Sequence, residues 1–246
     1  MHGYLLTWAV MAVFPLSCAL PPPGAGDASV GQLAGSPVDP FSRPQQCQGY
    51  VALSIDDGPT VTSDLFVQLL VRYKIPATFF NTGENTKKLP SVVALEQATP
   101  GVQFGNHTWN HADLTALSPE QVRAQILQTK VVQGSEVTFF RPPFGASNDM
   151  VDQEVNKAGL LEVLWTRDSK DFDASSPEQI VGQSRGMRAG GILLLHDRPL
   201  TARALPGIIA SYYDQGLCFG GIAHSLVPQS PEESPALLFN AKAVAP

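Results

Sequence analysis

Polar residues that can bind a metal or move a proton directly follow five apolar runs of this chain. In chain order they are Asp56 and Asp57, His107 and His111, Arg141, Asp168, and His196. Carboxylates and imidazoles bind divalent metals and exchange protons, and a guanidinium pairs with a carboxylate. If the apolar runs are parallel strands, their carboxyl ends share one edge of a sheet, and we expect these side chains to meet there.

The two histidines of NHTWNH, His107 and His111, are four residues apart. A single helical turn would put both imidazoles on one side, and a carboxylate from another strand would complete a three-ligand metal site that leaves positions open for water. Two surface histidines are the alternative for this pair alone. The aspartate pair at another strand end favours the metal.

Asp56 and Asp57 stand side by side in SIDDGP, where their charges repel. A divalent cation beside one carboxylate and a guanidinium beside the other would keep both ionised, and Arg141 is available as the guanidinium. One aspartate would then bind the metal, and the other would act as general base toward a water molecule whose pKa the metal lowers toward about 7. Turn-capping residues before Gly58-Pro59 are the alternative.

His196 ends the apolar run ILLL, from where it could protonate a leaving group. Asp168 could hold or tune this imidazole. The alternatives are a core histidine with satisfied hydrogen bonds and an aspartate that serves a turn or caps a helix.

The elements that must position these residues alternate along the chain. Continuous apolar runs predict strands that are covered on both faces. They lie at 49–55, 75–80, 102–105, 137–140, 160–165, 191–195 and 217–222. Helix starts lie between them: Ser118 and Ser176 each precede Pro-Glu-Gln, which supplies an N-cap, a proline at the first position and a glutamine three residues after the cap. This order predicts an α/β fold with a parallel sheet, open or closed into a barrel.

Length and charge narrow the classes of protein. A chain of 246 residues suits one α/β domain with a sizeable core. The net charge is −6, and the basic residues are scattered, which argues against a nucleic-acid partner. Nothing in the sequence demands a second chain, so we expect a monomer.

The two ends of the chain differ from its middle. Residues 1–19 form an apolar stretch too short for a comfortable membrane span, with a possible cleavage point after Ala19. We expect a secretory signal and a secreted protein without stable membrane association; because the stretch lacks Lys and Arg, an uncleaved anchor is the alternative. Residues 20–46 are predicted as a flexible linker and 227–246 as a loose tail, which leaves 47–226 as the catalytic domain.

Two cysteines remain after the signal. Cys47 precedes the first predicted strand, and Cys218 lies near the end of the last one. In an oxidising compartment a bridge between them would tie the two ends of the domain together. Two free buried thiols are the alternative.

The motifs SIDDGP, NHTWNH, RPPFG, DSKDF and LLLHD, in this order and spacing, resemble the five motifs of the polysaccharide deacetylase family, the NodB-homology carbohydrate esterases of family 4. The resemblance covers about residues 47–225. It implies a distorted seven-stranded (β/α) barrel. Within the family the chain looks most like compact secreted chitin deacetylases and acetylxylan esterases.

This resemblance implies a role for each residue of the site. Asp56 would be the catalytic base. Asp57, His107 and His111 would hold the metal, usually Zn²⁺ and in some members Co²⁺ or Ni²⁺. Arg141 would orient Asp56.

The resemblance further implies that Asp168 tunes His196, the general acid. The backbone N–H of Phe144 would stabilise the oxyanion, and Leu194 would line the pocket for the acetyl methyl group. Phe172 stands where the family usually has Trp, a departure that would alter the groove beside the acetyl group, next to Asp168 and Asp171.

The expected activity is removal of acetyl groups from a polysaccharide. We expect an N-acetylated glycan such as chitin or chitooligosaccharides, because such glycans are the commoner target of the family. Acetylxylan is the alternative substrate for the same residues. A non-catalytic glycan-binding protein is the alternative from another class, but the chain retains the base, the acid and all three ligands.

Overall fold

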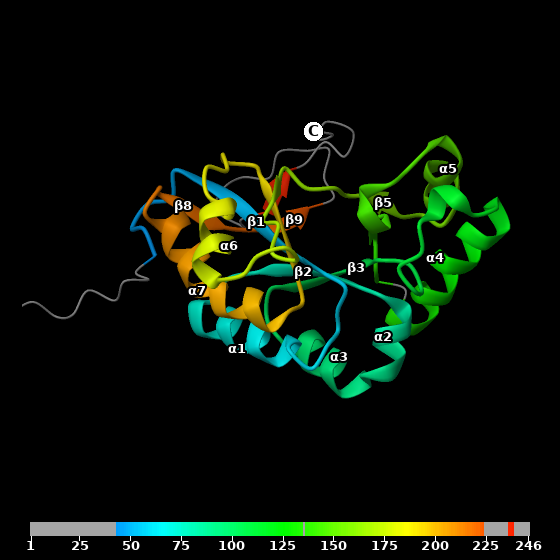
Figure 1. Ribbon diagram of the computed structural model, residues 1–246, viewed down its shortest axis with the longest axis horizontal. Helices are drawn as coiled ribbons and strands as arrows, with labels where there is room; N and C mark the ends of the chain where they lie inside the picture. Colours follow the sequence, from blue (N-terminus) through cyan, green and yellow to red (C-terminus); the bar gives the residue numbers. More distant parts are fainter. Residues whose placement is uncertain (1–42, 135, 224–235, 239–246) are drawn as a thin grey trace, which may run out of the picture. The chain divides into compact units, whose positions relative to one another are not determined.

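The computed structural model describes residues 43–134, 136–223 and 236–238, which all lie in one compact unit spanning 39–246 (Figure 1). The predicted signal, at 1–19, lies outside the described residues, as do most of the predicted linker and tail. Among the described residues no helix is long and apolar enough to cross a membrane.

Eight strands form one parallel sheet. They are β1 (Gly49–Asp56), β2 (Ala77–Asn81), β3 (Val102–Asn106), β4 (Phe139–Phe140), β5 (Leu161–Glu162), β6 (Arg167–Asp168), β7 (Ile192–His196) and β8 (Leu217–Phe219). The order across the sheet is β5-β4-β3-β2-β1-β7-β6, and β8 pairs with the first residues of β1. The sheet ends on two-residue strands, β5 and β6, which do not pair with each other in the described structure. The predicted α/β fold, a distorted barrel of parallel strands, is confirmed.

The connections between strands carry helices that lie outside the sheet in Figure 1. They are α1 (Ser63–Tyr73), α2 (Gly83–Lys88), α3 (Pro90–Gln97), α4 (Pro119–Gln133), α5 (Asp149–Lys157), α6 (Pro177–Ser184) and α7 (Pro199–Tyr213). Both predicted caps are present. Ser118 forms a reciprocal capping box with Gln121, and the Ser176 hydroxyl accepts the N–H of Gln179.

The alternation of side chains along β1 explains why the site faces the barrel interior. Val51, Leu53 and Ile55 pack in the large core with α1 and α7. Ser54 and Asp56 therefore point to the opposite face, because successive strand residues alternate. Both bind Arg141 there.

Three features of the fold differ from the sequence prediction. Strand β6 was not predicted, because Arg167–Asp168 has no apolar run. The predicted strand at 217–222 is split into β8 and β9 (Gly221–Ala223). Strand β10 (Ala236–Leu238) pairs with β9, so the prediction of a loose tail is wrong for these three residues.

The bridge between Cys47 and Cys218 is present, with the Cα atoms 5.6 Å apart. It joins the residues before β1 to β8, which lies beside β1. The predicted link between the two ends of the domain is confirmed.

Candidate active site

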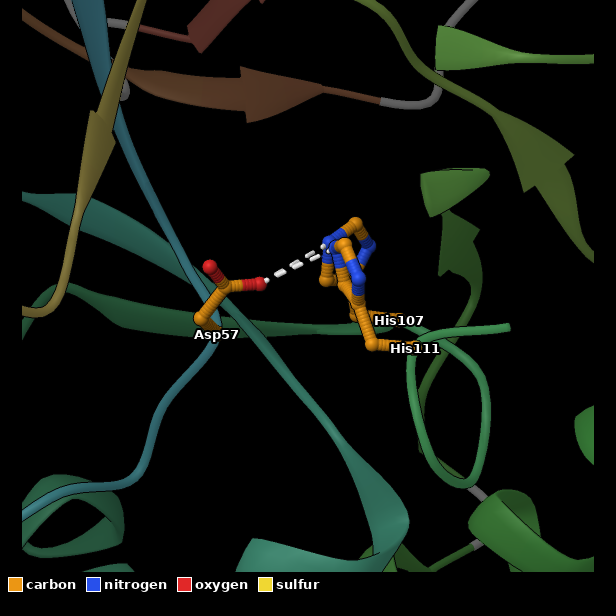
Figure 2. Close-up of side chains that lie close together, drawn as sticks. All are labelled: Asp57, His107 and His111. Atoms are coloured by element: carbon orange, nitrogen blue, oxygen red, sulfur yellow. Dashed lines mark ion pairs between the residues drawn. The ribbon is translucent and has the colours of Figure 1, made fainter. Parts of the chain in front are cut away.

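Three side chains from two loops converge as a candidate metal centre. Asp57 follows β1, whereas His107 and His111 lie in the loop after β3. One ligand atom from each lies within 4.8 Å of the others, and Asp57 Oδ1 is 3.5 Å from His107 Nε2 and 3.3 Å from His111 Nε2 (Figure 2). The structure thus brings together the three predicted ligands.

The two imidazoles converge through a loop and not through the helical turn that we expected. No helix covers the stretch from His107 to His111. Thr108 and His111 instead adopt left-handed backbone conformations, with φ of 65° and 60°, and these reverse the chain. Spacing alone could not reveal this conformation.

The hydrogen bonding of the cluster suits a divalent cation. His107 Nδ1 lies 2.7 Å from the carbonyl oxygen of Arg141, so Nδ1 carries the hydrogen and Nε2 turns its lone pair toward Asp57. Asp57 Oδ1 is buried and completes no hydrogen bond with another described residue. Two imidazole nitrogens and one carboxylate oxygen form a ligand set that zinc commonly takes in catalytic sites.

The charges of the cluster follow from its packing. Burial would raise the pKa of Asp57, but the neighbouring His107 and His111 outweigh it and lower the pKa to about 2. Burial lowers the pKa of His111, and the neighbouring His107 lowers it further. An ionised carboxylate beside a neutral imidazole is the form that binds a cation.

Asp56 is held beside this cluster by a buried guanidinium. Arg141 Nη1 donates to Asp56 Oδ1 at 2.7 Å, and Arg141 is fully buried. The rest of the guanidinium is fixed by the carbonyl oxygens of Val163 and Leu164. Asp56 Oδ2 faces the cluster, 3.7 Å from His107 Nε2. One oxygen is therefore anchored and the other is directed at the candidate metal centre.

His196 is held by Asp171, and the prediction that Asp168 holds it is wrong. His196 Nδ1 lies 2.7 Å from Asp171 Oδ1, while Asp171 Oδ2 accepts the backbone N–H of His196 and the hydroxyl of Thr201, each at 2.7 Å. Asp168 instead accepts the N–H of Lys170 at 2.7 Å.

The backbone between Asp168 and Asp171 explains why Asp171, and not Asp168, binds His196. Lys170 has a φ of 49°, and this left-handed turn brings Asp171 inward, where it is buried, and leaves Asp168 to cap the turn. The motif DSKDF contains both aspartates. In the sequence, the one sign that Asp171 could take this role was its presence as a second aspartate three residues after Asp168.

His196 is poised as a proton donor. Burial would lower its pKa, but the hydrogen bond and charge of Asp171, helped by the charges of Asp56 and Asp57, raise it to about 9. The ring therefore carries a proton at neutral pH. A charged imidazole beside a site for a leaving group can act as a general acid.

A cavity of about 590 Å³ is shared by the candidate metal ligands, Asp56 and His196. Asp57, the two ligand histidines, Asp56 and His196 all line it, together with Phe144, Trp165, Asp168, Phe172, Leu194 and Arg198. Phe144 and Leu194, the predicted oxyanion donor and methyl-pocket residue, thus both lie at this cavity, and Asp168 lines it as well, although His196 Nδ1 is bound by Asp171.

The loops around the cavity hold strained backbone. Of the six non-glycine residues with positive φ in the described structure, five belong to these loops: Asp57, Thr108, His111, Phe144 and Lys170. Such conformations cost on the order of 1–3 kcal/mol each and persist where surrounding contacts impose them. Their concentration here marks this edge of the sheet as the functional one.

Comparison with known proteins identifies the family of this chain. The family described as polysaccharide deacetylase matches residues 43–163. The chain is 31% identical over 183 residues to the bifunctional xylanase/xylan deacetylase of Cellvibrio japonicus, across 72% of this chain and 27% of that protein. The chain therefore spans about a quarter of that relative's length.

Two further similarities extend over most of the other protein. The chain is 34% identical over 187 residues to a peptidoglycan-N-acetylglucosamine deacetylase of Bacillus cereus, across 72% of this chain and 87% of that one. The structure resembles the family 4 carbohydrate esterase from Streptomyces lividans in complex with acetate, with a TM-score of 0.69, 33% identity, and coverage of 72% of this chain and 94% of that one. The chain belongs to the polysaccharide deacetylase family, a family of hydrolases that deacetylate carbohydrates.

Proposed function

We propose that this protein is a secreted, metal-dependent hydrolase that removes acetyl groups from an N-acetylated glycan such as chitin or chitooligosaccharides. The convergence of three groups on one cavity carries the proposal: a metal-ligand cluster, a carboxylate anchored by a guanidinium, and an imidazole that carries a proton. Hydrolysis of an acetamide needs all three, because water must lose a proton, negative charge must be stabilised, and the amine must gain a proton.

Asp57, His107 and His111 would hold the metal, with Zn²⁺ as the first candidate and Co²⁺ or Ni²⁺ as alternatives. When bound, such a cation polarises a carbonyl oxygen and lowers the pKa of water. The tautomer of His107 is set for this role by the Arg141 carbonyl oxygen.

Asp56 would take the proton of the attacking water. Its Oδ2 is free to do so because Arg141 binds Oδ1 and keeps the carboxylate in place. The backbone N–H of Phe144, at the wall of the cavity, would donate to the oxyanion that forms at the acetyl carbon. Leu194 would face the acetyl methyl group.

His196 would pass its proton to the departing nitrogen. Asp171 supports this step by stabilising the imidazolium and by fixing the ring through Nδ1. The Nε2 hydrogen is then the one available to the leaving group.

Acetylxylan is the second candidate substrate. The same residues would protonate an alkoxide as readily as an amine, and the Cellvibrio japonicus relative is named as a xylan deacetylase. The N-acetyl substrate is placed first because the Bacillus cereus relative, named for N-acetylglucosamine, is covered over 87% of its length.

Secretion is proposed from the apolar residues 1–19 and from the disulfide, which suits an oxidising compartment. The bridge would tie the two ends of the domain together.

Acetate release tests the proposed activity. The protein is stripped of metal, restored with Zn²⁺ or Co²⁺, and assayed on chitooligosaccharides and acetylxylan in parallel. We expect metal-restored release from chitooligosaccharides, and release from acetylxylan alone would select the second candidate. Asp56→Asn should bind glycan without releasing acetate. If wild type and Asp56→Asn both bind and neither releases acetate, the protein is a glycan-binding member of the family.

A further inference from the structure

A second cluster of buried acidic and polar residues lies behind the site, and the proposed mechanism does not use it. Glu96 of α3 is completely buried, and Asn81 at the end of β2 and Asp197 after β7 are nearly so. Asn81 Nδ2 donates to Glu96 Oε2 at 2.8 Å. Ser63, the first residue of α1, donates its hydroxyl hydrogen to Asp197 Oδ2 through a short contact.

This cluster lacks hydrogen-bond donors. Three of its buried oxygens, Asn81 Oδ1, Glu96 Oε1 and Asp197 Oδ1, have no partner among the described residues. Ser63 has one hydroxyl hydrogen, which it gives to Asp197, and its oxygen already accepts the N–H of Thr60 at 3.0 Å. Ser63 therefore has no hydrogen left for Glu96 and could only accept one from it.

Within the described part of the chain, no cationic side chain forms an ion pair with either of the two buried carboxyl groups. Asp197 is the charged residue that acts on Glu96, and it has the same sign. Helices α1 and α2 pack against α3, but none of their described charged side chains pairs with Glu96; these are Asp64, Arg72, Glu84, Lys87 and Lys88. Two unpaired buried carboxylates side by side would be strongly unfavourable, and a proton on one of them removes the conflict.

We propose that Glu96 is a neutral carboxylic acid in the folded protein at mildly acidic pH, and that its hydroxyl hydrogen makes it a positioning residue for the active site. Protonation converts one Glu96 oxygen from an acceptor into the hydrogen-bond donor that the cluster lacks. The Glu96 hydroxyl could then donate to Ser63, whose own hydroxyl donates to Asp197. This inference rests on the proposed function only for its catalytic consequence, since the protonation itself is a property of the fold.

The cluster reaches the active site through Asp197. The carboxylate of Asp197 accepts the N–H of Thr60 at 3.0 Å, and its backbone N–H donates to the carbonyl oxygen of Asp56 at 3.0 Å. Asp197 also directly follows His196. The cluster therefore connects the segment after β1, which begins at Asp57, to the end of β7.

The segment after β1 packs tightly against this cluster. A Cβ atom at Gly58 would lie 2.5 Å from Asn81 Oδ1 and 3.1 Å from Asp197 Oδ2, so the backbone beside Asp57 sits directly on the cluster. A negative charge on Glu96 would repel Asp197 and disturb the segment that carries Asp57.

The electrostatics agree with the geometry. Burial raises the pKa of Glu96 to about 7, and the charge of Asp197 raises it further, against the hydrogen bond from Asn81. Glu96 is then about nine-tenths protonated at about pH 6 and a few per cent protonated at about pH 8.5.

Infrared spectroscopy tests the protonation without any assay of activity. The wild-type protein, measured at about pH 6 and about pH 8.5, should show the carbonyl stretch of a protonated carboxylic acid at the lower pH and lose it at the higher. Glu96→Gln should lack this pH-dependent band, and Glu84→Gln, which changes a partly exposed glutamate on α2, should retain it. A band that is absent from the wild type or unchanged in Glu96→Gln overturns the proposal.

Denaturation tests the link to the fold. Because the folded pKa lies above the ordinary value, the stability that Glu96 contributes is present at low pH and is lost as the pH rises toward and through about 7. The denaturation midpoint of the wild type should fall over this range relative to Glu96→Gln, whose amide keeps a donor at every pH. Parallel curves would contradict the proposal.

Catalysis tests the positioning role. Between about pH 6 and about pH 8.5, kcat of the wild type should fall on the order of tenfold relative to Glu96→Gln, following the loss of the protonated fraction. Glu96→Leu, which offers no hydrogen, should have a lowered kcat at both values. If infrared and denaturation results hold while kcat of the wild type and Glu96→Gln stay parallel, the positioning role is wrong; if no variant releases acetate, the proposed function fails and the protonation stands.

Discussion

His107 and His196 are the same side chain placed after two strands of one sheet, yet their surroundings prepare them for different chemistry. Each ring places Nδ1 2.7 Å from an oxygen of the protein. For His107 this oxygen is the neutral carbonyl of Arg141, which takes the Nδ1 hydrogen and adds no negative charge to the ring. For His196 it is the carboxylate of Asp171, which raises the pKa to about 9.

The difference shows that the partner of Nδ1 sets the role of the histidine. A carbonyl partner leaves Nε2 with a free lone pair, as a metal ligand requires. A carboxylate partner stabilises the imidazolium, as a general acid requires. The two histidines can therefore share one cavity without competing for the same role.

Removal of the ligand histidine should have the largest effect. His107→Ala should lower kcat/KM by more than about 10³-fold, because two ligands no longer hold the metal in place. Equilibrium dialysis with Zn²⁺ and acetate release measure the two consequences. Asn110→Ala, an exposed neighbour in the same loop, is the matched control and should bind metal normally. Full activity of His107→Ala would show that it is not a ligand.

Removal of the acid histidine should reduce turnover and leave metal binding intact. We expect His196→Ala to lower kcat by about 10²–10³-fold on a glycan, which is the usual contribution of a general acid. An aryl acetate, whose leaving group needs no proton, should lose much less. Equal losses on both substrates would argue that His196 binds substrate and does not protonate the leaving group.

Replacement of the carboxylate that binds His196 should make this ring more like His107, which is neutral and has an uncharged partner at Nδ1. Asp171→Asn removes the main cause of the raised pKa of His196, a cause that persists when a cation neutralises Asp57. Since the acid form is then lost at lower pH, the alkaline limb of the kcat profile should move to lower pH, and kcat should fall about 10–100-fold.

Asp168→Asn is the control for this exchange, because Asp168 lines the same cavity but binds Lys170. It should leave the alkaline limb in place. A shifted limb in Asp168→Asn together with an unshifted one in Asp171→Asn would restore the role that the motif suggested for Asp168.

Removal of the hydrogen bond from Thr201 to Asp171 should have the smallest effect. Thr201→Val deletes the hydroxyl that donates to Asp171 Oδ2 and keeps the side-chain volume. A bond of this kind to a charged group contributes about 1.5–3 kcal/mol to stability. We expect a lower denaturation midpoint, a loss of kcat of about two- to fivefold, and a small downward shift of the alkaline limb. A loss as large as that of Asp171→Asn would mean that Thr201 itself orients His196.

The residues that lie directly after apolar runs could be predicted from the sequence. Asp56, Asp57, His107, Arg141 and His196 all lie at the ends of strands or in the residues just after them, as expected. The physical reason is local: a run of apolar residues predicts a buried strand, and parallel strands bring their carboxyl ends to one edge. The order of the motifs was therefore enough to predict that these side chains meet.

Residues whose position depends on a turn could not be predicted in the same way. Asp168 and Asp171 are both aspartates of one motif, and the left-handed turn at Lys170 selects which of them faces His196. His111 likewise reaches Asp57 through a left-handed loop and not through a helix. Sequence periodicity carries no information about such single-residue conformations, because surrounding contacts impose them.

Glu96 shows what remains hidden from the sequence altogether. In the run SVVALEQ it is an ordinary helical glutamate, and nothing beside it indicates burial. Its surroundings come from β2, α1 and the end of β7, far apart along the chain. The strand pattern and the motifs specify the chemistry of the site, since they depend on neighbours in the chain; the charge states of His196 and Glu96 depend on distant groups and burial, which exist only after the chain has folded.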